Sequence, residues 1–157
     1  MLKKILLWVA VIGMSIIIFC FSAKPSQESA EMSKKIAGKA ANIVENKITL
    51  KENKRIDFFE NIHYFVRKSA HFLEFAILSV LTFYLAKGYR LSLKICIIVA
   101  LSYCIVFAIG DEIHQLFVEG REGRVTDVLI DFFGSSVGVG VCCLFIKLKK
   151  SAKQKHS

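Results

Sequence analysis

The sequence predicts an all-α membrane protein with four transmembrane helices, and two features of its composition lead to this prediction. Of its 157 residues, 54% are hydrophobic, and the mean hydropathy is +0.50. The apolar residues also form long blocks instead of recurring at amphipathic spacing, which is typical of membrane spans. The net charge of +9 has no zinc-finger, P-loop or aromatic-basic pattern beside it, so we expect no nucleic-acid partner. Basic excess is also what the cytoplasmic segments of membrane proteins carry.

The first two predicted spans are residues 5–21 and 69–86. Residues 5–21 carry no charge and would rise about 25 Å at roughly 1.5 Å per residue, which is just enough to cross a bilayer. A cleaved signal peptide is the alternative for this run, because two lysines precede it. Phe21 is a poor residue for the −3 position of cleavage at Ala23, so we expect the span to be retained. His71 and Glu74 are the ionisable residues of the second span.

The third and fourth predicted spans are residues 91–109 and 125–146. Lys94 lies near one end of the third, where its stem can reach the interface. The fourth contains Asp127 and Asp131 and is otherwise apolar or small. All five cysteines lie inside apolar blocks, where we expect them to behave as small buried hydrophobes: Cys20, Cys96, Cys104, Cys142 and Cys143.

The distribution of charge predicts that both termini are cytoplasmic. Four spans place three short segments on one side of the membrane, and these hold ten bases and no acid: Lys3, Lys4, Lys87, Arg90, Lys94, Lys147, Lys149, Lys150, Lys153 and Lys155. The other side holds twelve bases and all thirteen acids, but ten of those bases are spread along residues 22–68. We give density more weight than total number in applying the positive-inside rule.

Residues 22–68 are predicted to form an amphipathic helical segment on the extracytoplasmic side. Two apolar stripes at helical spacing support this prediction. The first consists of Met32, Ile36, Ala40, Ile43 and Val44, and the second of Ile56, Phe59, Ile62 and Val66. Both are expected to lie on the bilayer or cap the bundle, and a partner-binding surface is the alternative.

Ionisable residues recur on one face of each later span. Arg67, His71 and Glu74 are spaced i, i+4, i+7 and so share a helical face. On the third span, Asp111, His114 and Gln115 share a face if the helix continues past Gly110, while Glu112 points aside. On the fourth span, one face carries two carboxylates followed by small residues: Asp127, Asp131, Gly134, Ser135, Gly138 and Cys142. Small residues in such a stripe let a neighbouring helix approach closely.

All these groups lie in the outer half of their spans, and this position predicts a shared polar pocket. A carboxylate that faced lipid would cost on the order of 3 kcal/mol, so the groups should face one another or a wet cavity. Arg121 and Arg124, in a loop with turn glycines at 120 and 123, can reach the same mouth. The predicted ligand-binding set is Arg67, Lys68, His71, Glu74, Asp111, Glu112, His114, Gln115, Arg121, Arg124, Asp127 and Asp131.

Three stretches of the chain resemble the VanZ-like family of small multi-pass bacterial membrane proteins. They are FSAKPSQES after the first span, RKSAHFLEF at the second, and GDEIHQLFVEGREGRVTDVLIDFFGSSVG joining the last two. The resemblance implies a setting in the cell envelope, because the family takes its name from a member associated with low-level resistance to the glycopeptide teicoplanin. The chain departs from the family pattern at Glu119, where Pro is usual, and at Phe75, where Tyr is common.

Three functions remain open from the sequence. The first is an outward-facing pocket that binds or shields an envelope lipid, a peptidoglycan precursor or a glycopeptide. The second is a membrane-embedded hydrolase or transferase acting on lipid-linked substrates, with His71, Glu74, Asp111, His114 and Asp127 as catalytic candidates. No firm metal site is predicted. If the enzyme depended on a divalent metal ion, the ligands would come from the same five residues and Glu112. The third is a structural or assembly partner in the membrane, in which the charges hold the helices together.

Overall fold

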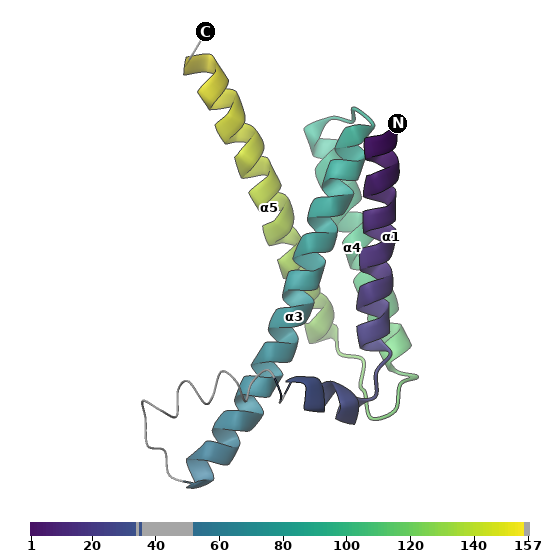
Figure 1. Ribbon diagram of the computed structural model, residues 1–157, viewed down its shortest axis with the longest axis vertical. Coiled ribbons are helices and arrows are strands. Elements are labelled where there is room, and N and C mark those ends of the chain that lie inside the picture. The colour runs from purple at the N-terminus through teal and green to yellow at the C-terminus, as the bar shows by residue number, and fades with distance from the viewer. Residues whose placement is uncertain (34, 36–51, 156–157) are drawn as a thin grey trace.

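The computed structural model describes residues 1–33, 35 and 52–155, and within 52–64 it describes the backbone alone. The long helices are α1 (Leu2–Ser22), α3 (Glu52–Gly88), α4 (Leu93–Gln115) and α5 (Val125–Lys155), and residues 26–33 form a short helical segment after α1 (Figure 1). Four stretches are long and apolar enough to cross a membrane: Leu2–Ser22, Phe65–Gly88, Leu93–Gln115 and Val125–Gln154. The predicted all-α fold with four spans is confirmed.

Most helix ends differ from the predicted boundaries by a few residues, and three of the differences have a local reason. α4 begins after Ser92, not at residue 91, because the Ser92 hydroxyl accepts a hydrogen bond from Ile95 N at 3.4 Å and caps the helix. α4 then continues past residue 109 to Gln115, whose side chain is buried against α1. α5 continues past residue 146 to Lys155, since lysine ends an apolar run but favours a helix.

Helix α3 corrects the predicted boundary between the outer segment 22–68 and the second span. It is one helix of 37 residues, about 55 Å long at 1.5 Å per residue, which exceeds the roughly 30 Å of a bilayer core. Residues 52–64 therefore extend the candidate span Phe65–Gly88 in line, and the start of α3 projects beyond the other helices (Figure 1). The apolar stripe from 36 to 44 and the side chains at 56, 59 and 62 lie outside the described residues.

The helices pack in two apolar clusters around α3, which contacts each of the other three long helices. One cluster joins α1, α3 and α4 through Val11, Ile18, Phe75, Leu78, Leu85, Cys104 and Ala108. The other joins α3, α4 and α5 through Phe83, Ala86, Cys96, Ala100, Val139 and Cys142. The prediction that every cysteine is buried holds for Cys96, Cys104 and Cys142; it is wrong for Cys20, which is exposed, and Cys143 is partly buried.

Helices α3 and α5 approach closely where α5 carries its glycines. A Cβ on Gly134 would collide with the carbonyl oxygen of Phe72, and one on Gly138 with the carbonyl of Ala76 and the hydroxyl of Ser79. This is the close approach that the stripe of small residues predicts.

The two ends of the bundle differ in chemistry. Both chain termini lie at one end (Figure 1). We call this the basic end, because it carries Lys3, Lys4, Lys87, Arg90, Lys94 and the lysines of α5. The opposite end, where α1 and α4 finish and α5 begins, is here called the polar end.

Replacing Gly138 with Ala should separate α3 from α5. The added methyl group has no space beside Ala76, and overpacking of this kind costs about 1–3 kcal/mol. We expect a lower melting temperature in detergent and a lower yield of monodisperse protein. Gly140→Ala is the matched control, because nothing lies within 4 Å of a Cβ at that position. Equal melting temperatures for the two variants would contradict the close packing.

Candidate functional site: a polar cluster at one end of the bundle

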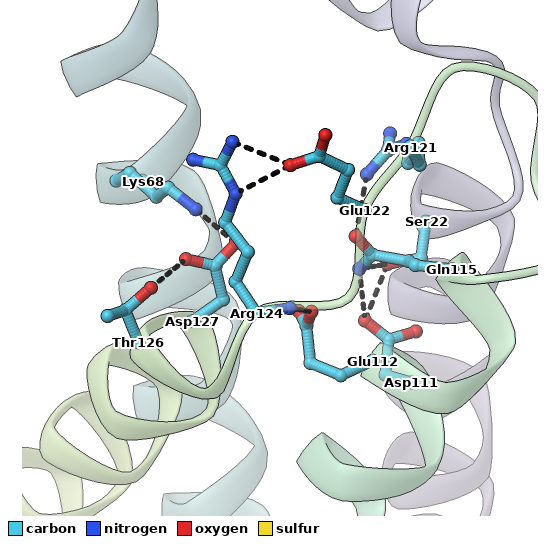
Figure 2. A network of polar contacts seen from close by, with 10 residues as sticks. All are labelled: Ser22, Lys68, Asp111, Glu112, Gln115, Arg121, Glu122, Arg124, Thr126 and Asp127. Carbon is cyan, nitrogen blue, oxygen red and sulfur yellow. Dashed lines mark hydrogen bonds and ion pairs between the residues drawn. The ribbon is translucent and has the colours of Figure 1, made fainter.

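The centre of the polar end is a hydrogen-bonded group that joins α1 to α4. The Ser22 hydroxyl donates to Asp111 Oδ2 at 2.6 Å, and Gln115 Nε2 donates to the same oxygen at 3.0 Å and to Ser22 Oγ at 3.2 Å (Figure 2). All three side chains are buried. Asp111 and Gln115 are one helical turn apart on α4, so the continuation of this helix past Gly110 brings them to the end of α1 together.

Arg121 ties the loop between α4 and α5 to the same place. Its Nε donates to the carbonyl of Lys24 at 2.9 Å, one terminal nitrogen to the carbonyl of Phe21 at 3.1 Å, and the other to Gln115 Oε1 at 3.3 Å. The carbonyl of Phe21 belongs to the last turn of α1, and its other bond is a longer one, of 3.4 Å, from Lys24 N. Burial lowers the pKa of Arg121 from its ordinary value, and the positive charge of Arg67 acts in the same direction. Arginine nevertheless stays protonated in proteins.

Two glycines allow the loop to take this path. Gly120 has a φ of 69°, in the left-handed region, and a Cβ there would lie 3.2 Å from Ser26 Cβ. A Cβ on Gly123 would lie 2.7 Å from the carbonyl oxygen of Glu112. The carbonyl of Glu119 accepts from Ser26 N at 3.2 Å, so the loop is tethered although Glu119 stands where the family pattern has Pro.

A second group of contacts joins α3, α4 and α5 on the other side of the polar end. Lys68 of α3 forms an ion pair with Asp127 of α5 (Figure 2). Glu112 points away from the group around Asp111, as the sequence predicts, and is buried where its Oε2 accepts from Arg124 N at 2.8 Å. The Arg124 side chain, which is half exposed, pairs with Glu122 at 2.9 Å.

Several buried polar atoms lack a hydrogen-bond partner among the described residues. They are Arg67 Nε, His71 Nδ1, Asp111 Oδ1, His114 Nδ1, and both carboxylate oxygens of Asp131. Such atoms are rare in proteins, because each costs the free energy of its lost hydration, and they call for a water, ion or ligand.

The pair Arg67 and Arg121 lines two cavities at the polar end of the part of the chain that the structure describes. The α1–α3 pocket, of about 190 Å³, is lined by Phe21, Lys24, Ser29, Met32, Ser33, Val66, Arg67, Ala70, His71, Glu74 and Arg121. The loop pocket, of about 250 Å³, is lined by Ser26, Arg67, Lys68, Gly120, Arg121, Glu122, Arg124 and Asp127. The first combines apolar walls with three ionisable side chains of α3, whereas the second is polar throughout.

The structure divides the predicted site residues into three groups. Seven line the two pockets: Arg67, Lys68, His71, Glu74, Arg121, Arg124 and Asp127. Three line neither of these pockets and form buried hydrogen bonds, and the first of them also lines a mostly apolar cavity beside Phe19: Asp111, Glu112 and Gln115. Two others line neither pocket: His114, whose ring centroid is 4.3 Å from that of Phe19 on α1, and Asp131, which is buried between helices. The sequence predicts a single pocket, whereas the structure has two pockets lined by Arg67 and Arg121 beside a network of buried hydrogen bonds.

The divalent-metal alternative finds no support in this arrangement. Among the residues that the structure describes, no three His, Cys, Asp or Glu side chains form a group that could hold a metal ion. Instead, Asp111 bonds Ser22 and Gln115, while Asp127 pairs with Lys68. His71 and Glu74 remain the only members of the predicted metal set that line the α1–α3 pocket.

Sequence reasoning missed the contribution of the first helix. The site includes the hydroxyl of Ser22 and the carbonyls of Phe21 and Lys24, which accept or donate its hydrogen bonds. The pockets are also lined by three serines that follow α1: Ser26, Ser29 and Ser33. The signal available was the stretch FSAKPSQES, which places small polar residues directly after an apolar span.

The helices and this network define a class, namely a small multi-pass membrane protein whose spans share a buried polar cluster at one end. The sequence profile of the VanZ/LLP1 family matches residues 7–146, and the chain belongs to this family. The family resemblance of the three sequence stretches is therefore confirmed. No curated protein and no solved structure matches the chain.

Arg121→Ala should destabilise the protein. The substitution removes the donor to the Lys24 carbonyl and to Gln115 Oε1, and leaves the Phe21 carbonyl with its longer bond from Lys24 N; each unsatisfied buried group costs about 1–3 kcal/mol. We expect a lower melting temperature and a lower abundance in the membrane. Glu122→Ala in the same loop is the control, since its side chain is exposed and its ion pair with Arg124 is worth less than about 1 kcal/mol. Wild-type stability of Arg121→Ala would show that the three bonds do not hold the loop.

Proposed function

We propose that this protein binds the phosphate-bearing headgroup of a cell-envelope lipid or lipid-linked cell-wall precursor at its polar end. The observation that carries the proposal is the pair Arg67 and Arg121, which lines both pockets with two positive charges. Arg67 Nε lacks a partner among the described residues, whereas Arg121 is held in place by carbonyl groups. A phosphate would complete the hydrogen bonding of Arg67 and relieve the repulsion between the two guanidinium groups.

The lining of the α1–α3 pocket supports a lipid as the source of this phosphate. Phe21, Met32, Val66 and Ala70 supply an apolar wall beside Arg67. Such a wall suits the first carbons of a lipid chain next to its headgroup. Each pocket is also smaller than the roughly 300–1,000 Å³ of sites for drug-sized ligands, so a headgroup fits better than a whole glycopeptide.

A link to glycopeptide resistance follows from this binding mode and from the family. A protein that covers the headgroup of an envelope precursor at the outer surface would shield it from an antibiotic acting there. The link requires that the polar end faces outward, as the density of bases at the opposite end predicts.

Arg67→Gln should weaken the binding of a polyprenyl phosphate by about tenfold or more. A hydrogen bond to a charged group is worth about 1.5–3 kcal/mol, and the substitution removes the donor that lacks another partner. Binding can be measured with the full chain in nanodiscs, and teicoplanin susceptibility can be measured beside membrane abundance. Lys94→Gln, at the basic end, controls for the loss of one positive charge. Unchanged binding, or loss of resistance only in proportion to abundance, would contradict the proposal.

The catalytic alternative has one observation in its favour. His71 and Glu74 lie one turn apart on α3 and line the same pocket, and His71 Nδ1 has no partner among the described residues. They could exchange a proton with a bound phosphoester and its attacking water.

His71→Ala should abolish phosphate release from a lipid-linked phosphoester if this alternative holds, and should leave binding of the polyprenyl phosphate intact because Arg67 remains. The measurement is phosphate released by the purified protein in nanodiscs. No release by the wild-type protein above an empty-nanodisc control would exclude turnover of that substrate and leave binding as the function.

A further inference from the structure

A cleft of about 760 Å³ opens at the basic end, between the last turns of α3 and the C-terminal part of α5. Its lining includes Tyr84, Lys87, Phe145, Lys149, Lys150 and Lys153. In Figure 1 this part of α5 leans away from α3, so the two helices that touch at the glycines of α5 are apart here. The cleft is at the other end of the bundle from the two pockets described above.

The cleft concentrates positive charge with no acidic residue nearby in the sequence. Four lysines, Lys87, Lys149, Lys150 and Lys153, line it. Every Asp and Glu of the chain precedes residue 75 or lies between 111 and 131, so neither the end of α3 nor the second half of α5 carries a carboxylate. An anion is therefore the ligand that these ammonium groups favour.

The order of residues along α5 matches the depth profile of a phospholipid. Lys149 and Lys153 lie at the end of the candidate span Val125–Gln154, the part of a membrane-spanning helix that meets the lipid headgroups. Phe145 is one turn before Lys149, about 6 Å deeper at 1.5 Å per residue, and its side chain is exposed. Tyr84 occupies the facing position on α3, one turn deeper than the end of that helix.

We propose that this cleft binds an anionic phospholipid of the leaflet at the basic end, with the phosphate among Lys87, Lys149 and Lys153 and an acyl chain along Phe145 and Tyr84. A membrane lipid is always available there, and basic residues between helices near the membrane surface attract acidic headgroups. A second copy of the chain is a poor occupant, because it would bring the same lysines into the cleft without a carboxylate to meet them. The proposal is independent of the function assigned to the polar end.

Lipid selectivity at position 145 tests the proposal. Trp8 is the only tryptophan of the chain, so the variant Trp8→Phe/Phe145→Trp carries a single fluorophore in the cleft. The full chain is reconstituted in phosphatidylcholine vesicles with either dibrominated phosphatidylglycerol or dibrominated phosphatidylcholine as quencher. We expect phosphatidylglycerol to be preferred at this position. Lys149→Gln/Lys153→Gln should reduce the preference by roughly fivefold or more, since one basic residue near a membrane surface contributes about 1 kcal/mol.

The matched control is Lys94→Gln/Lys147→Gln, which removes the same charge from the same end of the bundle but from residues that do not line the cleft. It should keep the preference. Equal quenching by the two lipids would overturn the proposal, and so would an equal loss in both double variants, which would indicate general surface attraction.

A second measurement uses the unlabelled chain, in case the Trp variant does not fold. Native mass spectrometry after equilibration with equal amounts of the two lipids should show retained phosphatidylglycerol on the wild-type chain and on the control pair, and less on Lys149→Gln/Lys153→Gln. A dimer that retains neither lipid would show that a second copy fills the cleft instead.

Discussion

The polar end depends on the three hydrogen bonds of Arg121. A helix that ends at a membrane interface leaves its last carbonyls without donors, and the low dielectric makes each of them costly. Arg121 supplies donors to the carbonyls of Phe21 and Lys24 from a loop that is about a hundred residues away in the sequence. Its third bond, to Gln115, connects the same guanidinium to α4. One side chain thus holds the end of α1, the end of α4 and the loop in a single arrangement.

The bonding pattern separates side chains that hold the fold from those available to a ligand. Ser22, Gln115 and one carboxylate oxygen of Asp111 bond one another, which offsets part of the cost of burying them, while Asp111 Oδ1 has no partner among the described residues. Arg67 and His71 are also partly buried but keep a nitrogen without a partner among the described residues. The residue types in the two groups are similar. Their hydrogen bonds, together with whether they line a pocket, distinguish a structural role from a binding role.

The angle between α5 and α3 shapes both ends of the protein. Gly134 and Gly138 allow contact with the backbone of α3 nearer the polar end, where Lys68 pairs with Asp127. Further along, α5 leans away from α3 and the cleft opens between the two helices (Figure 1). The close approach at the glycines and the divergence beyond them thus give one packed end and one open end.

The sequence by itself determined the all-α class, the four spans, the family and most of the charged residues of the polar end. Long apolar blocks and helical spacing are local properties, so they could be predicted without knowledge of the fold. The continuous helix through residues 52–88 was harder to predict, because the charges that end the apolar run of the second span do not end its backbone hydrogen bonding.

Tertiary structure decided which of the charged residues are bonded to each other. Arg121 was predicted to face a ligand, and the structure adds bonds to the carbonyls of Phe21 at the end of α1 and of Lys24 just after it; a backbone carbonyl leaves no mark in a sequence. Ser22 was missed for a related reason, since its partner Asp111 is 89 residues away. His114 and Asp131 share helical faces with site residues but line neither pocket, because helical spacing gives a direction around one helix and not the position of its neighbours.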